Sequence, residues 1–366
     1  MMQHQPPPPN DPKLFANLRA LHHGAIDEWR RTQARTLDMF GFGVRECPYE
    51  VIAEGPRWRL RHYLGEAGSG GGNVPLLMVP APIKRPYIWD ILPNVSVVRF
   101  CLNRGFGVYL LEWRPPGTSD GNAGIEAYAQ AIADASEAAE VHAAAEGPPV
   151  VIGHSLGGTL AAIAATLRPD RVRGLVLLGA PLSFAPGSSP FRDLVGANGR
   201  HLSGFGTVAG SELSQSCAAL APSTFVWTRW IDGFLSVSDP AAFDIHVRIE
   251  RWALDEVPLP GRLVQQIVDW LYCEDRFGEG KLFLENRALG PEDLKAPVLA
   301  VVNDADEIGP RATVDPFFAR MNGVDTDVVE HPAEIGVGLQ HLAVLAGRRA
   351  NAETWPSIAD WIMAHS

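Results

Sequence analysis

A serine between glycines follows a short apolar run in the segment PVVIGHSLGGTLAAIAATL, which begins at residue 149. The match Gly153-His154-Ser155-Leu156-Gly157 has the spacing Gly-x-Ser-x-Gly and is followed by an alanine-rich helical pattern. In this strand-turn-helix context the glycines relieve crowding in a tight turn, and the N–H after the serine faces a developing oxyanion. We predict that Ser155 is a nucleophile and that the Leu156 N–H is an oxyanion donor. The His154 side chain is expected to point elsewhere.

A serine hydroxyl is a weak nucleophile unless a histidine and an acid activate it, and in this arrangement the acid and then the histidine follow the serine along the chain. Two carboxylates, Asp304 and Asp306, follow the apolar run PVLAVV at 297–302. We favour Asp306, because it begins Asp-x-Ile-x-Pro, the pattern that commonly ends this strand in the α/β-hydrolase superfamily. Asp304 is the alternative, and for both the competing interpretation is a solvated loop carboxylate or a helix cap.

Three histidines, His331, His341 and His365, lie near or beyond the last strand-like run. His331 comes directly after the run TDVVE, so we expect it to end that strand. His365 lies in the closing helical pattern. We favour His341 as the base, because it follows a glycine-containing loop and begins an apolar helix, from which it can reach the serine. Its competing interpretation is a hydrogen-bonded histidine at the start of a helix.

A second oxyanion donor is expected in the loop after the apolar run VPLLMVPA. Pro80 and Pro82 have no N–H to offer. We therefore expect the Ile83 N–H in this role, with Ala81 or Lys84 as alternatives. A plain structural turn is an equal interpretation.

Apolar runs and helical patterns alternate through the first half of the chain, which predicts a mostly parallel sheet with helices on both faces. Strands are expected over 74–81, 108–113, 149–154, 174–181, 297–302 and 326–330, after a pair of strands within 49–64. The alternation stops over 183–295, which we interpret as an inserted cap. The predicted fold is therefore an α/β-hydrolase fold. Its four parts are a proline-rich tail and amphipathic helix (1–45, with the tail at 1–12), a first core part (46–182), the cap (183–295) and a second core part (296–366).

The composition limits the class of protein. The chain has 366 residues, 46% of them hydrophobic, and a net charge of −11, which argues against nucleic acid or an anionic membrane as partner. No basic and apolar leader precedes the first helix and no run is apolar enough to span a membrane, so we expect a cytoplasmic protein. Cys47, Cys101, Cys217 and Cys273 are scattered, which predicts free thiols and neither a disulfide framework nor a zinc site.

Residues 74–117 resemble a stretch of the polyhydroxyalkanoate synthases. In that family a proline-containing oxyanion loop precedes Tyr-x-x-Asp-Leu-x-Pro-x-x-Ser and, later, Ser-Trp-Arg-Asn-Pro; here the chain reads YIWDILPNVS and EWRPP. RWALDEVPLPG is similar to the family's Trp-Asn-x-Asp-x-Thr-x-x-Pro-Gly, and NDADEIGP and QHLAVL resemble its Asp-His-Ile-x-Pro and Gly-His-Ile-Ala-Gly motifs. The resemblance covers roughly 48–365, is weakest over 183–245, and implies the acid role for Asp306 and the base role for His341.

The departures from that family concern the chemistry. The synthases carry cysteine where this chain has Ser155, and they have a long N-terminal domain where this chain has about 45 residues. The family's cap asparagine and threonine are Ala253 and Val257 here. Acyl exchange between coenzyme A and an enzyme thioester is nearly balanced, whereas a serine ester lies lower in free energy and favours transfer to water. Intracellular polyester depolymerases and lipase-like hydrolases use serine as the nucleophile in an otherwise similar arrangement.

These observations favour a serine hydrolase of carboxylic esters, such as hydroxyacyl esters or short polyesters, which needs no metal or organic cofactor. The first alternative is a synthase-like acyltransferase that uses hydroxyacyl-coenzyme A, for which Lys84, Arg85 and Arg114 are too few cations to decide. The second alternative is an inactive scaffold that binds polyester granules or a synthase through the N-terminal helix and the cap tryptophans. These tryptophans are Trp227, Trp230, Trp252 and Trp270. Packing over the active site is the more common role of such residues. The sequence leaves the oligomeric state open, a homodimer included.

Overall fold

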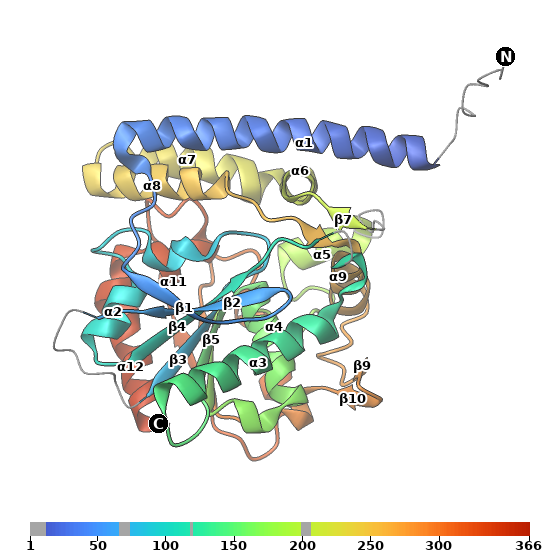
Figure 1. Cartoon of the computed structure of the whole chain (residues 1–366), viewed down its shortest axis with the longest axis vertical. Coiled ribbons are helices and arrows are strands. Elements are labelled where there is room, and N and C mark those ends of the chain that lie inside the picture. The colour runs from blue at the N-terminus through green and yellow to red at the C-terminus, as the bar shows by residue number, and fades with distance from the viewer. Residues whose placement is uncertain (1–11, 66–73, 118–119, 199–205) are drawn as a thin grey trace.

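An eight-stranded sheet forms the centre of the computed structural model, which describes residues 12–65, 74–117, 120–198 and 206–366 (Figure 1). The strand order is β1-β2-β4-β3-β5-β6-β11-β12; β2 pairs antiparallel with β1 and β4, and all other neighbours are parallel. The predicted mostly parallel sheet is thus confirmed. The strands are β1 (Tyr49–Glu54), β2 (Trp58–Tyr63), β3 (Pro75–Val79), β4 (Gly107–Trp113), β5 (Val150–His154), β6 (Gly174–Leu178), β11 (Val298–Val302) and β12 (Thr326–Glu330).

Helices cover both faces of the sheet, because the buried strands send alternate apolar side chains to opposite faces. Leu77 and Val151 belong to the hydrophobic cluster under one layer of helices, and their neighbours Leu76 and Ile152 belong to the cluster under the other. The first layer contains α3 (Ile125–Ala143) and α4 (Leu156–Leu167), and the second contains α2 (Val97–Asn103), α11 (Ala343–Ala346) and α12 (Trp355–Ala364). The short α10 (Asp315–Phe318) precedes β12.

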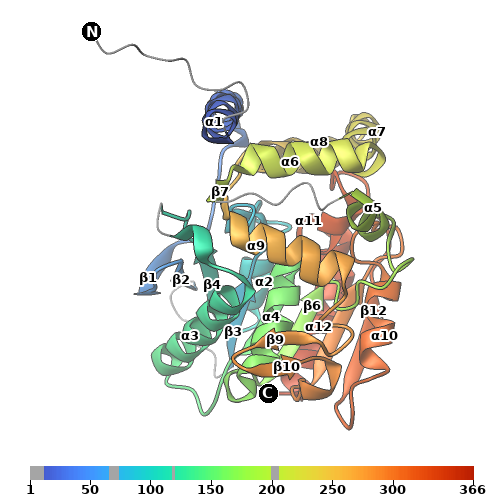
Figure 2. The same ribbon diagram turned by 90° about the vertical axis from the view of Figure 1, so that its right-hand side faces the viewer.

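The segment predicted as a cap, 183–295, lies between β6 and β11 and contributes no described strand to the central sheet. Its helices α6, α7 and α8 lie above the sheet in Figures 1 and 2. Its later half instead packs into the core: Leu263, Phe277 and Leu282 share a hydrophobic cluster with α3 and α4. The elements of the segment are α5 (Pro190–Asn198), β7 (Thr207–Val208), α6 (Gly210–Leu220), α7 (Thr228–Ser236), α8 (Pro240–Ala253), β8 (Leu259–Pro260), α9 (Gly261–Gln266), β9 (Leu282–Leu284) and β10 (Arg287–Leu289).

The predicted N-terminal helix is present as α1 (Pro12–Leu37), which continues as a short π-helix to Phe42. The chain leaves the helix at Gly41, whose φ of 89° lies in the region that favours glycine. α1 lies across the cap helices in Figure 1, and its Arg30 donates to the Ala253 carbonyl at 2.8 Å. The expected proline-rich tail, up to residue 11, lies outside the described residues.

Two expectations from composition concern the thiols and the membrane. All four cysteines are free: Cys47 and Cys101 are buried, and Cys217 and Cys273 are partly buried. Across the described ranges, every helix is too short or too polar to cross a bilayer.

Candidate active site

Ser155 occupies the tight turn between β5 and α4. Its φ of 55° and ψ of −135° are unusual for a residue with a side chain and indicate local strain. The Ser155 N–H donates to the Leu178 carbonyl at 3.0 Å, which fixes the turn against the end of β6. A β-carbon on Gly153 would lie 2.4 Å from the Gly158 Cα, and one on Gly157 would lie 2.4 Å from the Val79 oxygen. The glycines are therefore required by close packing around the serine.

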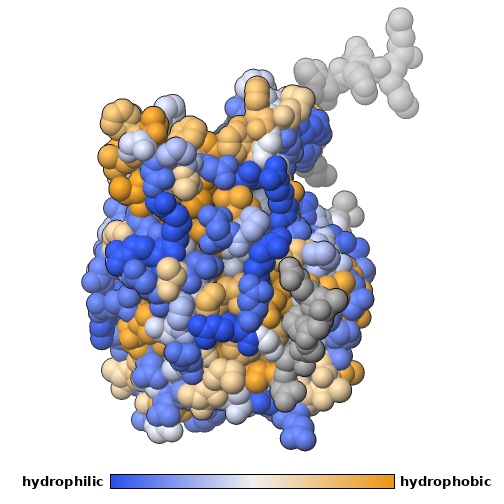
Figure 3. All heavy atoms as spheres, turned by 90° about the vertical axis from the view of Figure 1, so that its left-hand side faces the viewer, coloured by the Kyte–Doolittle hydropathy of each residue, from blue (hydrophilic) through white to orange (hydrophobic). Residues whose placement is uncertain are grey.

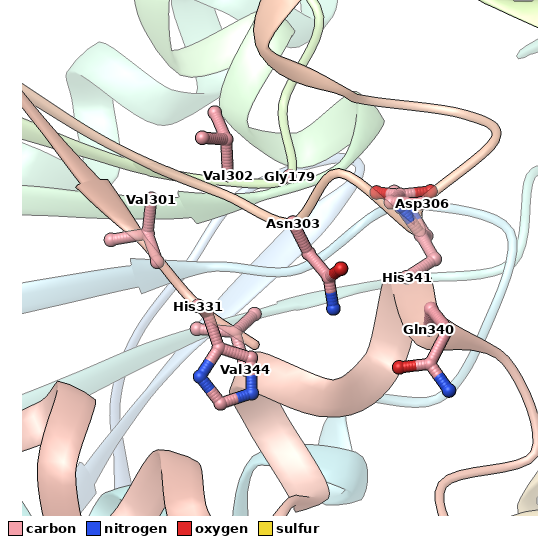
Figure 4. Close-up of a pocket in the computed structure, with 9 residues that line it drawn as sticks. All are labelled: Gly179, Val301, Val302, Asn303, Asp306, His331, Gln340, His341 and Val344. Carbon is pink, nitrogen blue, oxygen red and sulfur yellow. The ribbon is translucent and has the colours of Figure 1, made fainter. Parts of the chain in front are cut away.

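Asp306 and His341 form a buried hydrogen-bonded pair, with His341 Nδ1 2.7 Å from Asp306 Oδ2. Asp306 follows the end of β11, and its other oxygen accepts the Ile308 N–H at 2.8 Å. His341 Nε2 is buried and has no hydrogen-bond partner among the described residues, Ser155 Oγ included. Figure 4 shows the two side chains against each other at one end of the cavity. With Nδ1–H donated to the carboxylate, the Nε2 lone pair is available as a base.

The rejected acid and histidines are placed differently. Asp304 is exposed. His331 follows β12: its Nδ1 lies 2.8 Å from Thr354 Oγ1, and its Nε2 lies 3.1 Å from Glu334 Oε1 without the geometry of a hydrogen bond. His365 bonds the Trp361 carbonyl at the end of α12. Of the sequence candidates, only the preferred pair is brought together as acid and base.

His154 has a role that the sequence did not reveal. Its ring lies 4.8 Å from the His341 ring, between centroids, and its Nε2–H donates to the His341 carbonyl at 2.8 Å. Burial, with a smaller contribution from the neighbouring His341, lowers the pKa of His154 to about 3. A neutral His154 therefore holds the main chain of the candidate base. The expectation that its side chain points away from the nucleophile agrees with this contact.

Two backbone N–H groups remain candidates for an oxyanion hole. Leu156 begins α4, so its N–H has no partner within the helix. The Ile83 carbonyl accepts from the Val257 N–H at 3.1 Å, which ties the loop to the segment after α8. The Pro80 carbonyl accepts from Trp113 Nε1 at 2.8 Å, and the Gly157 Cα packs against this same stretch of backbone. The loop that carries Ile83 thus lies directly against the turn of the nucleophile.

The three cations considered for coenzyme A binding all face carboxylates. Lys84 Nζ lies 3.0 Å from Glu256 Oε1, and burial lowers the pKa of Lys84 to about 8. Arg85 lies 3.8 Å from the Glu112 carboxylate, and Arg114 lies 3.4 Å from that of Glu54. Two of these acids are shared with other cations: Glu256 also pairs with Arg30, and Glu112 also pairs with Arg59 and Arg61.

The cap contacts the loops of both Asp306 and His341. Thr224 donates to the Glu307 carboxylate, next to Asp306. The Asp232 carboxylate of α7 accepts the N–H groups of Gly336 and Gly338, at 2.8 and 2.9 Å, and His246 Nδ1 at 2.7 Å. A second cavity beside Asp306 and His341 is lined by cap and loop residues, namely Thr224, Thr228, Ala305, Glu307, Ile308, Leu339 and Gln340.

Comparison with known proteins gives both relatives and a fold. Residues 94–341 match the family described as "Protein of unknown function (DUF3141)". The chain is 26% identical over 345 residues to the poly(3-hydroxyalkanoate) polymerase subunit PhaC of Haloferax mediterranei, covering 93% of this chain and 69% of the relative. For the same subunit of Haloarcula marismortui the identity is 24% over 340 residues, with 88% and 69% covered. These relatives confirm the resemblance to the synthases.

Two solved hydrolase structures have a similar fold. A soluble variant of monoglyceride lipase from Saccharomyces cerevisiae superposes with a TM-score of 0.58 at 12% identity, over 88% of this chain and 96% of that one. The hydrolase BphD from Rhodococcus gives 0.51 at 15% identity, over 87% and 98%. The α/β-hydrolase fold predicted from the sequence is therefore confirmed.

Proposed function

Since the chain belongs to the family described as "Protein of unknown function (DUF3141)", whose match includes Ser155, Asp306 and His341, we propose that it is a serine hydrolase of carboxylic esters. We propose hydroxyacyl esters or short polyesters as its substrates. The observation that carries this proposal is the buried His341 Nε2, which has no hydrogen-bond partner among the described residues while Nδ1 is held by Asp306. A buried nitrogen without a hydrogen bond destabilises the folded protein, so such an atom calls for an explanation. Acceptance of a proton from the nucleophile would explain it at His341 Nε2.

In the proposed mechanism His341 Nε2 takes the Ser155 proton as the hydroxyl oxygen attacks the ester carbonyl. Asp306 keeps the imidazole ring oriented and stabilises its positive charge. The N–H groups of Leu156 and Ile83 stabilise the oxyanion, and His341 then gives its proton to the leaving alcohol. Water, deprotonated by His341, releases the acyl group from Ser155.

The acyltransferase alternative is favoured by the polymerase relatives, which are similar over most of the chain. It uses the same residues and replaces water with a hydroxyl acceptor. One observation weighs against it: serine replaces the cysteine of the synthases. Lys84, Arg85 and Arg114 lie near carboxylates, but two of those carboxylates are shared with other cations, so the three cations do not decide between the interpretations.

An apolar face on α7 supports a water-insoluble ester as substrate. Between residues 230 and 237 all exposed side chains are apolar, and Trp230 and Phe234 are 74% and 80% exposed. Figure 3 shows hydrophobic side chains gathered at the upper left of the molecule, where the cap helices lie. The buried Asp232 of this same helix holds the loop before His341. We propose that this face, Trp230, Ile231, Phe234, Leu235 and Val237, adsorbs to the surface of the ester.

The same exposure bears on the scaffold alternative. Trp227 and Trp230 are 64% and 74% exposed, whereas Trp252 and Trp270 are partly buried. Trp252 donates to the Arg85 carbonyl at 2.7 Å, and the Trp270 ring lies 4.7 Å from the Arg276 guanidinium carbon. Two of the four tryptophans are thus available to a surface. Adsorption and catalysis are compatible, and the presence of Ser155, Asp306 and His341 in the chain favours the enzyme.

A fluorophosphonate probe with peptide mapping tests the nucleophile. We expect labelling at Ser155 in the wild type, none in Ser155→Ala, and at least a ~10³-fold slower rate in His341→Ala. His365→Ala is the matched control and should label at the wild-type rate. Absence of labelling at Ser155, or equal labelling after His341→Ala, would contradict the mechanism.

Product analysis separates hydrolysis from acyl transfer. A 3-hydroxybutyryl thioester and a nitrophenyl ester are each incubated with the wild type, and free acid and polymer are quantified. We expect free acid from both substrates. Polymer with little free acid would instead support the acyltransferase, and no turnover of either would support the scaffold.

A further inference from the structure

Two histidines and a glutamate converge on the sheet near its β1 edge, three strands away from Ser155. Glu50 of β1 pairs with His62 of β2, and His62 pairs with Tyr109 of β4, so these three residues are cross-strand neighbours. The last turn of α3 brings His142 to the same place. Because adjacent strands are about 4.8 Å apart, this cluster lies roughly 14 Å from the strand that carries the nucleophile.

The side chains of this cluster have the spacing of a metal site. His62 Nδ1 lies 3.2 Å and His142 Nε2 lies 3.8 Å from Glu50 Oε1, and one donor atom from each residue lies within 4.8 Å of the others. Ligands at about 2.0–2.1 Å in a tetrahedral zinc site lie about 3.4 Å apart. The two distances to Glu50 are already close to that spacing, so a metal would require only that the two imidazole donors, which lie within 4.8 Å of each other on partly or fully exposed side chains, approach one another.

Contacts behind the two imidazoles orient them. The Tyr109 hydroxyl lies 2.9 Å from His142 Nδ1, and the His62 ring stacks on the Tyr109 ring at 5.0 Å between centroids. When Nδ1–H donates to the tyrosine oxygen, the Nε2 lone pair of His142 is free and faces Glu50. Ligating histidines in proteins have such a partner on their second nitrogen, which fixes the tautomer. Tyr109 is buried and so provides a rigid base for both rings.

We propose that Glu50, His62 and His142 bind one divalent transition-metal ion, for which Zn²⁺ is the best match to two imidazoles and a carboxylate. Water completes the coordination. The ion would join the edge strand β1 and the strand β2 to the end of α3, and so stabilise this side of the sheet. The proposal departs from the expectation, drawn from the cysteines, of a protein without a zinc site, and it is independent of the chemistry at Ser155.

Zinc binding by the full chain tests the proposal. The protein is treated with a chelator, dialysed, and titrated with ZnCl₂ in a calorimeter, and its thermal midpoint is measured with and without the metal. We expect one ion per chain and a higher midpoint on binding. The double variant His62→Gln/His142→Gln should bind at least ~100-fold more weakly, and Tyr109→Phe, which keeps the ring, about tenfold more weakly.

Two further measurements make the result specific. His365→Gln, a histidine on the distant α12 end, is the matched control and should bind like the wild type. Co²⁺ should give the visible absorption of a four-coordinate site in the wild type, and this absorption should be absent from the double variant. Absence of stoichiometric Zn²⁺ binding in the wild type, or equal affinity in the folded double variant, would overturn the proposal.

Discussion

His154 Nε2 lies 2.8 Å from the main-chain oxygen of His341, so the residue before the candidate nucleophile holds the backbone of the candidate base. The bond spans 187 positions of the sequence and joins the end of β5 to the turn that begins at Gln340. The ring can donate this bond in either protonation state, and it is burial that keeps His154 neutral by lowering its pKa to about 3.

We predict that His154 makes the protein less stable in acid. The native state keeps this residue neutral down to a pKa of about 3, whereas the unfolded chain takes up a proton near the ordinary pKa of 6.5. Protonation of His154 in the unfolded chain should therefore lower the free energy of unfolding by about 1.4 kcal/mol per pH unit as the pH drops from about 6.5 toward 3. Denaturant unfolding at pH 7, 6 and 5 measures the slope. His154→Gln should have a shallower slope than the wild type, and identical slopes would contradict the assignment.

The sequence was sufficient for the fold, and it singled out an acid and a histidine that the structure places in contact. Apolar runs that alternate with helical patterns are a local signal of a parallel sheet, and they predicted all six strands of its parallel part. Chain order and the Asp-x-Ile-x-Pro pattern selected Asp306 and His341, which the structure places 2.7 Å apart. Their catalytic roles stay predictions.

Contacts between distant segments were not predictable. The contact of His154 with His341, and that of Asp232 with Gly336, depend on how the cap and the loops pack, and no local pattern encodes this. The pattern of apolar residues in the later half of the cap segment does not distinguish a cap helix from a part of the core. The sequence therefore did not reveal that residues such as Phe277 complete the core. The Glu50 cluster likewise requires the register of β1 on β2.

Gly157→Ala should damage the active site through packing alone. The new β-carbon would lie 2.4 Å from the Val79 oxygen and 2.6 Å from the Pro80 carbonyl carbon, so the turn or the loop that carries Ile83 must move. We expect a loss of about 1–3 kcal/mol of stability and of at least ~100-fold in kcat/KM for a nitrophenyl ester. Gly24→Ala is the matched control: its β-carbon meets no atom within 4 Å, and a helical alanine should be neutral or stabilising by up to about 1 kcal/mol. Full activity in Gly157→Ala would contradict this packing.

Asp232→Asn should lower turnover through the position of His341, without a direct effect on substrate binding. The amide replaces a charged acceptor of three hydrogen bonds with a group that has one acceptor oxygen, which loosens the Gly336–Gly338 turn ahead of His341. Loss of such bonds costs about 1.5–3 kcal/mol, so we expect kcat to fall about tenfold or more with little change in KM. Steady-state kinetics on a soluble ester measures both. Asp244→Asn, which removes a partly exposed carboxylate from α8, is the control and should keep both constants; a rise in KM alone in Asp232→Asn would contradict a positioning role.

Removal of apolar side chains from α7 should lower the activity on insoluble substrates and leave the activity on soluble substrates unchanged. In Trp230→Gln/Phe234→Gln two highly exposed side chains become polar, so folding stability should change little. Burial of such a side chain against an apolar surface contributes about 1.5–3 kcal/mol, and the double variant should therefore adsorb to dispersed polyester more than tenfold more weakly. We expect hydrolysis of the dispersed ester to fall in parallel, while hydrolysis of a soluble nitrophenyl ester stays within twofold of the wild type. Leu18→Gln/Leu21→Gln, which changes exposed side chains of α1, is the matched control and should resemble the wild type on both substrates. Equal losses on soluble and insoluble esters would show that α7 acts on the site itself and not through the substrate surface.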